Sequence, residues 1–284
     1  MKLVKSFIKY FIGIILFFIL SGLLTISPVL FFNYSTSANM SYTRVAHRGA
    51  AALAPENTLA AVQKGLSHNP DRIAIDVQQT KDGQVVVLQD ITLDRTTNGS
   101  GLVKDLTLAE IKTLSAGSWF SPEFEQEKVP LLQEVLKEID GRATLVIEIK
   151  KGGYFYPGIE ENILKIIDEF DAKDWCIIHS FSTQIIKKIH ELDPDIRVHK
   201  LFKAMLRFTP LMKADGWELF RFQDFPYVDE YSIHYRFANK NIISKIHAMG
   251  KKVNVWTVND KNLIEELLAL GVDGIITDHP DWLE

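Results

Sequence analysis

His47 and Arg48 stand side by side after a short apolar stretch, and Glu56 follows in the same region of the chain. An imidazole can exchange a proton near neutral pH, and a guanidinium offers a fixed fork of donors that matches phosphate oxygens. The pair therefore predicts chemistry on a phosphate group. The alternative is an ordinary loop in which Arg48 pairs with Glu56, and these residues by themselves favour neither interpretation.

Two acidic residues, Asp76 and Glu148, lie within apolar runs that are typical of strands. Side chains alternate along a strand, so Glu148 shares one face with Lys150. A buried acid needs a partner, and two carboxylates from separate strands could share a hard divalent cation, which takes oxygen ligands. The alternative is an ion pair of Lys150 with Asp76 or Glu148 that holds nothing else.

The elements that must position these side chains are short apolar runs that alternate with helical stretches. Strands are predicted at residues 44–46, 73–77, 85–88, 145–149, 175–179, 196–201, 230–233, 252–257 and 274–276. Helices are predicted at 59–66, 108–114, 131–139, 159–170, 183–192, 238–249 and 261–270, and Gly250 and Gly271 stand where helix-ending glycines are expected. Strand–helix alternation predicts a mainly parallel sheet with helical crossovers.

About 240 residues form this part of the chain, close to the roughly 250 of an eightfold barrel. We therefore predict an α/β fold of the TIM (β/α)₈ type. A doubly wound open sheet is the rival, although no Gly-x-Gly-x-x-Gly turn follows a strand. Residues 80–83 are typical of a turn between two strands because they contain Asp-Gly. In either architecture the site lies at the carboxyl ends of the strands.

Residues 10–32 contain no charged side chain, and Lys2, Lys5 and Lys9 precede them. As a helix this stretch would span roughly 34 Å, enough to cross a hydrocarbon core of about 30 Å. We predict a membrane anchor at 1–34, a linker at 35–42 and the barrel domain at 43–284. The lysines favour a cytoplasmic N-terminus and an extracytoplasmic domain. The alternative is a cleaved signal peptide, whose apolar region is usually only about 7–15 residues long.

The charge balance argues against nucleic acid as a partner. The net charge is −4, and the residues before position 41 hold three lysines and no acid, so the rest of the chain is more acidic still. An acidic domain without a basic run binds nucleic acid poorly. The single cysteine, Cys176, excludes a disulfide within the chain and lies in an apolar run, where we expect it to be buried.

Six motifs in order resemble those of the glycerophosphodiester phosphodiesterases over residues 43–284. They are Val-Ala-His-Arg-Gly at 45–49, Pro-Glu-Asn-Thr at 55–58, Asp-Val at 76–77 with Thr-Lys-Asp-Gly at 80–83, Glu-Ile-Lys at 148–150, Trp-Thr-Val-Asn at 256–259 and Gly-Val-Asp-Gly-Ile-Ile-Thr-Asp-His-Pro at 271–280. The resemblance implies a barrel that hydrolyses a glycerophosphodiester, or a polyglycerol phosphate, to glycerol phosphate and an alcohol.

The resemblance also implies roles for single residues. His47 would be a general acid/base, and Arg48 and Lys150 would hold the phosphate. One divalent cation, Ca²⁺ or Mg²⁺, would be bound by Asp76 and Glu148, with Glu56 close by. Separately from the resemblance, Trp256 lies at the end of the strand predicted at 252–257, where it could form an apolar wall for a glycerol or head group or fill the core.

Two positions depart from the family's pattern. The second strand normally carries Glu-x-Asp, but its first position is Ala74; the third normally ends in His-Asp, but the histidine position is Gln89. Alanine supplies no ligand, and glutamine cannot exchange a proton near neutral pH. Losing a general acid/base costs about 10²–10⁴ in rate. The sequence thus predicts an impaired, membrane-anchored phosphodiesterase with a weakly bound cation, or a non-catalytic relative that binds phosphodiesters or a protein. An unrelated barrel enzyme is the third reading.

Two other histidines are candidates to replace the missing imidazole. His179 and His234 lie near the ends of predicted strands, where either could reach the site. The competing interpretation is that both are packing or surface histidines.

Overall fold

The computed structural model describes residues 41–202, 222 and 225–283. The predicted anchor at 1–34 lies outside these residues, as does the linker up to residue 40. Within the described ranges, none of the helices is long and apolar enough to cross a membrane.

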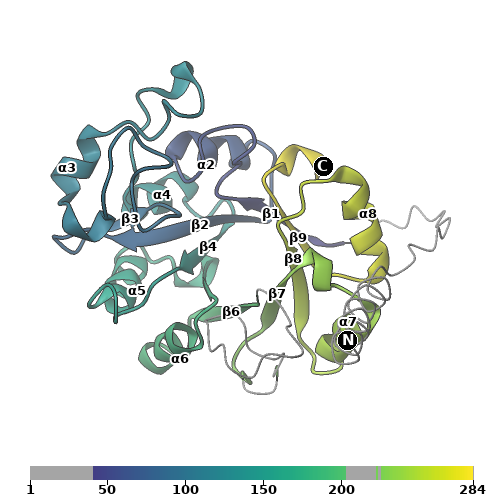
Figure 1. The fold of residues 1–284 in the computed structure, drawn as a ribbon. Helices are drawn as coiled ribbons and strands as arrows, with labels where there is room; N and C mark the ends of the chain where they lie inside the picture. The colour runs from purple at the N-terminus through teal and green to yellow at the C-terminus, as the bar shows by residue number, and fades with distance from the viewer. Residues whose placement is uncertain (1–40, 203–221, 223–224, 284) are drawn as a thin grey trace, which may run out of the picture. The chain divides into compact units, whose positions relative to one another are not determined.

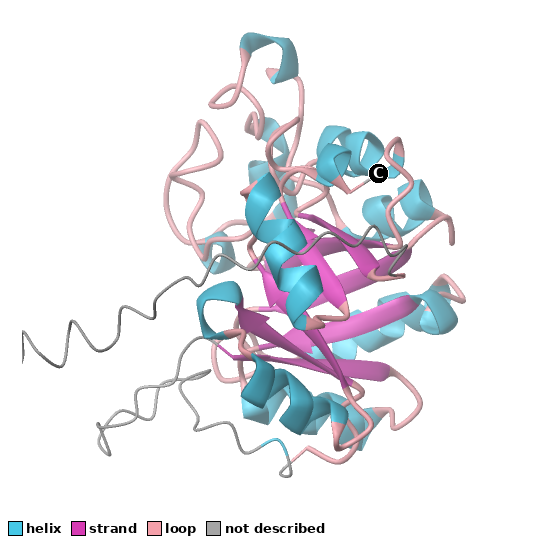
Figure 2. Ribbon diagram, turned by 90° about the vertical axis from the view of Figure 1, so that its right-hand side faces the viewer, coloured by secondary structure: helices cyan, strands magenta, loops and turns pink. Residues whose placement is uncertain are grey.

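Eight parallel strands close into a barrel, with helices on the outside (Figures 1 and 2). The barrel strands are β1 (Thr43–His47), β2 (Arg72–Gln79), β4 (Thr144–Ile149), β5 (Cys176–Ser180), β6 (Arg197–Phe202), β7 (Glu230–His234), β8 (Lys252–Trp256) and β9 (Gly274–Thr277). β1 pairs with both β2 and β9, which closes the ring. The predicted barrel is therefore confirmed and the open sheet is wrong.

One predicted strand stays outside the ring. β3 (Val85–Val87) pairs antiparallel with the end of β2. The Asp-Gly turn at 80–83 reverses the chain, and Gly83 adopts a left-handed φ of 78° there. The hairpin brings Gln89 back alongside β2, where the Gln78 side chain donates a hydrogen bond to the Gln89 carbonyl.

The helices begin and end close to the predicted positions. They are α2 (Leu59–Leu66), α3 (Leu108–Thr113), α4 (Leu132–Ile139), α5 (Ile159–Glu169), α6 (Thr183–Leu192), α7 (Lys240–His247) and α8 (Lys261–Leu270). Asp260 caps the amino terminus of α8 by accepting hydrogen bonds from two backbone N–H groups. Gly271 ends α8 with a left-handed φ of 95°, and Gly250 lies just after α7 with a φ of 69°.

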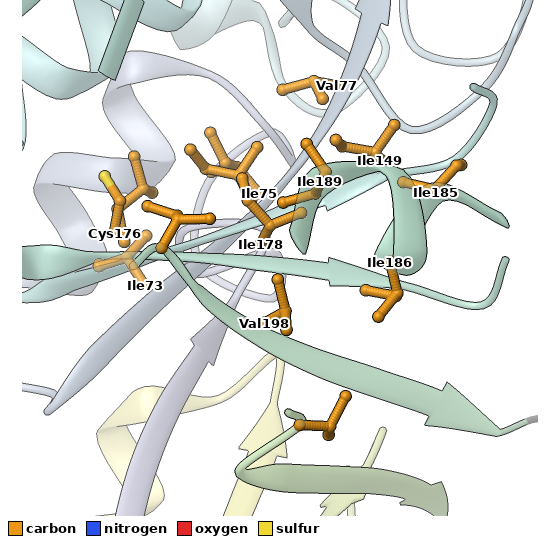
Figure 3. Close-up of a cluster of buried hydrophobic side chains, with 14 of the residues drawn as sticks. Ile73, Ile75, Val77, Ile149, Cys176, Ile178, Ile185, Ile186, Ile189 and Val198 are labelled. Carbon is orange, nitrogen blue, oxygen red and sulfur yellow. The ribbon is translucent and has the colours of Figure 1, made fainter. Parts of the chain in front are cut away.

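The main core lies between the strands and the surrounding helices. Figure 3 shows Ile73 and Ile75 of β2, Ile178 of β5 and Ile189 of α6 in one buried cluster. Each such side chain contributes about 1.5–3 kcal/mol when fully buried. Because Ile73 and Ile75 face the helices, the alternating residues of β2 must face the barrel interior. Cys176 is buried as predicted, and burial raises the pKa of its thiol to about 12.

The barrel interior contains a buried ion pair. Arg72 of β2 donates two hydrogen bonds to Glu230 of β7, at 2.6 and 2.8 Å. Asn254 donates a third, at 2.7 Å, and His199 Nδ1 lies 3.6 Å from the same carboxylate. Burial disfavours the charged forms, but the bonds from Arg72 lower the pKa of Glu230 to about 2, whereas burial lowers the pKa of His199 to about 3.

This network predicts a loss of stability in acid. Both pKa values are depressed on folding, so the unfolded chain binds more protons than the folded chain as the pH falls. Stability is lost first as the pH falls below the ordinary value of 6.5 for His199, and again from 4.5 toward 2 for Glu230. Glu230→Gln should cost about 3–5 kcal/mol at pH 7, because Arg72 stays buried without its counter-ion. Urea unfolding of the natural chain and the variant from pH 3 to 7 measures this. If the free energy of unfolding of the variant fell with pH below 4.5 as steeply as that of the natural chain, the prediction would be contradicted.

Candidate active site at the barrel mouth

A cavity of about 590 Å³ opens at the carboxyl ends of the strands. Its lining includes the predicted residues His47, Arg48, Asp76, Glu148, Lys150 and Trp256, together with Ala74 and Gln89. Glu56 is not among the lining residues, but it contacts one of them, as described below. The structure thus brings the sequence-predicted side chains to one place, as the rule for parallel barrels requires.

His47 ends β1 and is held by an acid from the other end of the chain. Its Nδ1 lies 2.7 Å from Oδ1 of Asp278, which directly follows β9. Asn259 donates to the other oxygen of Asp278 and accepts hydrogen bonds from the Asp278 backbone N–H and from Thr277. Because Asp278 occupies Nδ1, Nε2 is the nitrogen left to exchange a proton with a bound molecule. Burial would raise the pKa of Asp278, but the bond to His47 lowers it.

Lys150 bridges the two acids that were predicted as metal ligands. Asp76 and Glu148 are register partners on β2 and β4, so their side chains share one face of the sheet. Lys150 Nζ lies 2.8 Å from Asp76 Oδ1 and 2.7 Å from Glu148 Oε1. Lys150 therefore forms ion pairs with both acids, the arrangement that was the alternative to a metal site.

The two carboxylates are not equally satisfied. Burial works against the ionisation of Asp76, but Lys150 and Arg48 hold the pKa of Asp76 below its usual range. Asn57 also fixes Asp76, because its amide donates to Oδ2 at 2.9 Å and its carbonyl accepts from the Asp76 backbone. By contrast, burial and the nearby Asp76 raise the pKa of Glu148.

Arg48 sits on a tightly turned backbone. Its φ is 52°, in the left-handed region, and Gly49 follows with a φ of 88°. A Cβ on Gly49 would lie 2.5 Å from the backbone of Ala61 in α2, so only glycine fits this turn. The turn places Arg48 Nη1 2.8 Å from Glu56 Oε1 and Arg48 Nε 3.3 Å from Asp76 Oδ2.

Glu56 has a second partner that the sequence reasoning missed. Arg95, in the loop after β3, donates to both Glu56 oxygens at 2.8 Å and to Asp90 at 2.6 Å. With Arg48 on Oε1 as well, both oxygens of Glu56 are already bonded. Arg95 thereby attaches the loop after β3 to Glu56 at the barrel mouth.

The two departures from the family pattern lie at the cavity wall. Ala74 is paired in register with His47, and its methyl group is the only side-chain group it presents there. Gln89 lines the cavity, and its buried Oε1 lacks a hydrogen-bond partner among the described residues. Gln89 can therefore accept a hydrogen bond but supplies no acid or base.

Of the two histidines proposed as replacements, only one lines the cavity. His179 of β5 is 4 % exposed, and burial lowers the pKa of its imidazole well below 6.5. It is therefore neutral at pH 7 and unsuited to act as a general acid. His234 packs on Trp256, with ring centroids 5.2 Å apart, and is not a lining residue. Trp256 itself lines the cavity beside Phe181, with ring centroids 5.4 Å apart, which favours its role as an apolar wall.

The donor set suits a divalent cation only in part. Within the described ranges, no three His, Cys, Asp or Glu side chains lie close enough together to hold a metal ion. Glu56, predicted as a nearby ligand, bonds two arginines instead. Two acids remain, Asp76 and Glu148, which are register partners on neighbouring strands and are bridged by Lys150. One or two carboxylates suffice for Mg²⁺ when waters and a substrate phosphate complete its shell.

The fold and the site together define a class of protein. It is an eightfold barrel in which an imidazole and two cationic side chains suited to phosphate line one cavity at the carboxyl ends of the strands. The model of the glycerophosphoryl diester phosphodiesterase family matches residues 47–282. The chain therefore belongs to this family, and with it to the phosphodiester hydrolases. Its members are generally dependent on a divalent metal.

Curated relatives and solved structures agree with this membership. The chain is 39 % identical over 242 residues to a glycerophosphodiester phosphodiesterase of Caldanaerobacter subterraneus, covering 84 % of this chain and 95 % of the relative. It is 34 % identical over 255 residues to one of Bacillus subtilis, covering 84 % and 83 %. The structure of an Oleispira antarctica phosphodiesterase in complex with the product sn-glycerol-3-phosphate matches with a TM-score of 0.75 at 29 % identity, covering 84 % of this chain and 93 % of that one.

Proposed function

We propose that this chain hydrolyses glycerophosphodiesters to glycerol phosphate and an alcohol, with low turnover, on the outer side of a membrane. The observation that carries the proposal is the convergence of the His47–Asp278 pair with Arg48 and Lys150 on one cavity. The relative that holds sn-glycerol-3-phosphate supports this substrate class. The uncharged stretch at 10–32 supports the anchor.

In this proposal the chain's own residues bind the phosphate and move one proton. Arg48 and Lys150 are the donors in reach of phosphate oxygens, and Trp256 covers the apolar side of the glycerol or head group. His47 Nε2 takes a proton from the attacking water or gives one to the leaving alcohol oxygen. Asp76 and Glu148 would hold a divalent cation, Ca²⁺ or Mg²⁺, which when bound neutralises charge on the phosphoryl oxygens.

We propose low turnover because Gln89, at the second acid/base position, cannot transfer a proton. Hydrolysis breaks the bond from phosphorus to the alcohol oxygen, so one group accepts the proton of the nucleophile and another protonates the leaving oxygen. Gln89 stands at the second position and can only hydrogen-bond. Solvent must then do this part, at a cost of about 10²–10⁴ in rate.

The full-length chain, assayed with glycerophosphoglycerol and glycerophosphocholine, tests this function. We expect release of glycerol phosphate that rises with Mg²⁺ or Ca²⁺ and falls with EDTA. His47→Ala should lower it by about 10²–10⁴. His247→Ala is a matched control, because His247 also pairs with a carboxylate at 2.7 Å but lies on α7, outside the cavity lining.

The second candidate is a non-catalytic relative that binds phosphodiesters or a protein at the membrane. Ala74 and Gln89 favour it, since they remove a ligand and an acid/base from the pattern of the family. Turnover equal in the natural chain and in His47→Ala, together with binding of glycerol phosphate, would favour this candidate over the enzyme.

A further inference from the structure

We propose that phosphate and a divalent cation bind this site in concert, because Lys150 occupies the cation's position until a phosphate draws it away. The proposal rests on the proposed function and specifies how the site takes up its cation. It begins from the bridging ammonium, which lies 2.8 Å from Asp76 and 2.7 Å from Glu148.

A cation that arrives alone meets a site whose charges are already compensated. The Lys150 side chain is 17 % exposed, and those of Asp76 and Glu148 are 3 % and 13 % exposed. To reach both carboxylates, the cation must displace the ammonium into a partly buried position without a counter-ion. Leaving one member of a buried pair uncompensated is strongly unfavourable.

No third carboxylate offsets this cost. Ala74 faces the cavity two residues before Asp76 on the same face of β2, but it has no ligand atom. Glu56 is bonded by Arg48 on one side and by the fork of Arg95 on the other. Within the described chain, the cation is left with the two acids that Lys150 bridges.

An arriving phosphate reverses the balance. Lys150 and Arg48 both line the cavity, so a phosphate there competes with Asp76 and Glu148 for them. As Lys150 turns to the phosphate, two neighbouring buried carboxylates lose their shared counter-ion, and a divalent cation replaces it. The phosphate also completes the cation's oxygen shell. Coupling of this kind is reciprocal, so the cation must tighten phosphate binding by the same factor.

Calorimetric titration of the full-length chain measures the coupling. We expect Mg²⁺ to bind about 10- to 100-fold more tightly with saturating sn-glycerol 3-phosphate than without it, and the phosphate to gain the same factor from Mg²⁺. Inorganic phosphate should produce a similar gain, because the glycerol takes no part in the exchange.

Two variants separate the exchange from direct attraction between the cation and the phosphate. In Lys150→Gln the ammonium no longer blocks the acids, so Mg²⁺ should bind without phosphate and the coupling should shrink. In Ala74→Glu a third carboxylate should bring the same result with Lys150 in place. Lys165→Gln, an exposed lysine on α5, should behave as the natural chain.

The outcomes are distinct. Equal Mg²⁺ affinity with and without glycerol phosphate, or undiminished coupling in Lys150→Gln, overturns the exchange while leaving the proposed function standing. Absence of any glycerol phosphate binding, with or without Mg²⁺, overturns both.

Discussion

A full-length variant that carries both Ala74→Glu and Gln89→His is expected to hydrolyse glycerophosphodiesters about 10²- to 10⁴-fold faster than the natural chain. The histidine restores the second group that exchanges a proton, which is worth this factor in rate. The glutamate adds a carboxylate on the same face of β2 as Asp76, where the charge of the ligands sets the affinity for a hard cation. The measurement is kcat and KM for glycerophosphoglycerol at saturating Mg²⁺ or Ca²⁺.

The matched control for this variant is Ala74→Gln with Gln89→Asn, which fills similar space without the charge or the imidazole. It should remain as slow as the natural chain. Thermal unfolding is a second measurement on the double variant. Its third buried carboxylate should lower the Tm in EDTA, and addition of the cation should raise the Tm by more than in the natural chain. No gain in kcat, or an equal gain in the control, would show that these two positions do not limit the reaction.

The fold followed from the sequence because its signals are local. The run at 73–77 predicted a strand, and its alternating residues Ala74 and Asp76 both line the cavity. Nine strands were predicted, although an eightfold barrel needs only eight. The Asp-Gly turn explains the extra strand. It makes β3 the return strand of a hairpin, so β3 is not part of the ring.

The pairing of the site's side chains could not be derived in the same way. His47 and Asp278 are separated by 231 positions, and Arg95 and Glu56 by 39. No periodicity relates such residues, because closure of the barrel brings them together. One signal was available for Asp278, which directly follows the last strand, at the edge where the site was expected. The sequence also left open whether Lys150 forms ion pairs with Asp76 and Glu148 or whether these acids bind a metal ion. The same acids and lysine on predicted strands are compatible with both arrangements.

Asp278→Asn is expected to lower kcat by about 10²–10⁴ with little change in KM. The amide of an asparagine would donate to Nδ1 of His47 and leave the proton on Nε2, so the ring could no longer take one there. Asp273→Asn is the matched control, since Asp273 pairs with His247 at the same 2.7 Å but is not a lining residue. Because the natural chain is expected to be slow, both substitutions are also measured in the Ala74→Glu, Gln89→His background.

A purely structural role for Asp278 makes a different prediction. Hydrogen bonds from His47 and Asn259 outweigh burial and depress the pKa of Asp278, so its ionised form stabilises the fold above its ordinary value of 3.8, and this contribution is lost as the pH falls below it. If stability were the whole effect, Asp278→Asn would lower the Tm and leave kcat per folded molecule unchanged. If Asp278 positions His47, kcat per folded molecule falls while the Tm stays close to that of the parent.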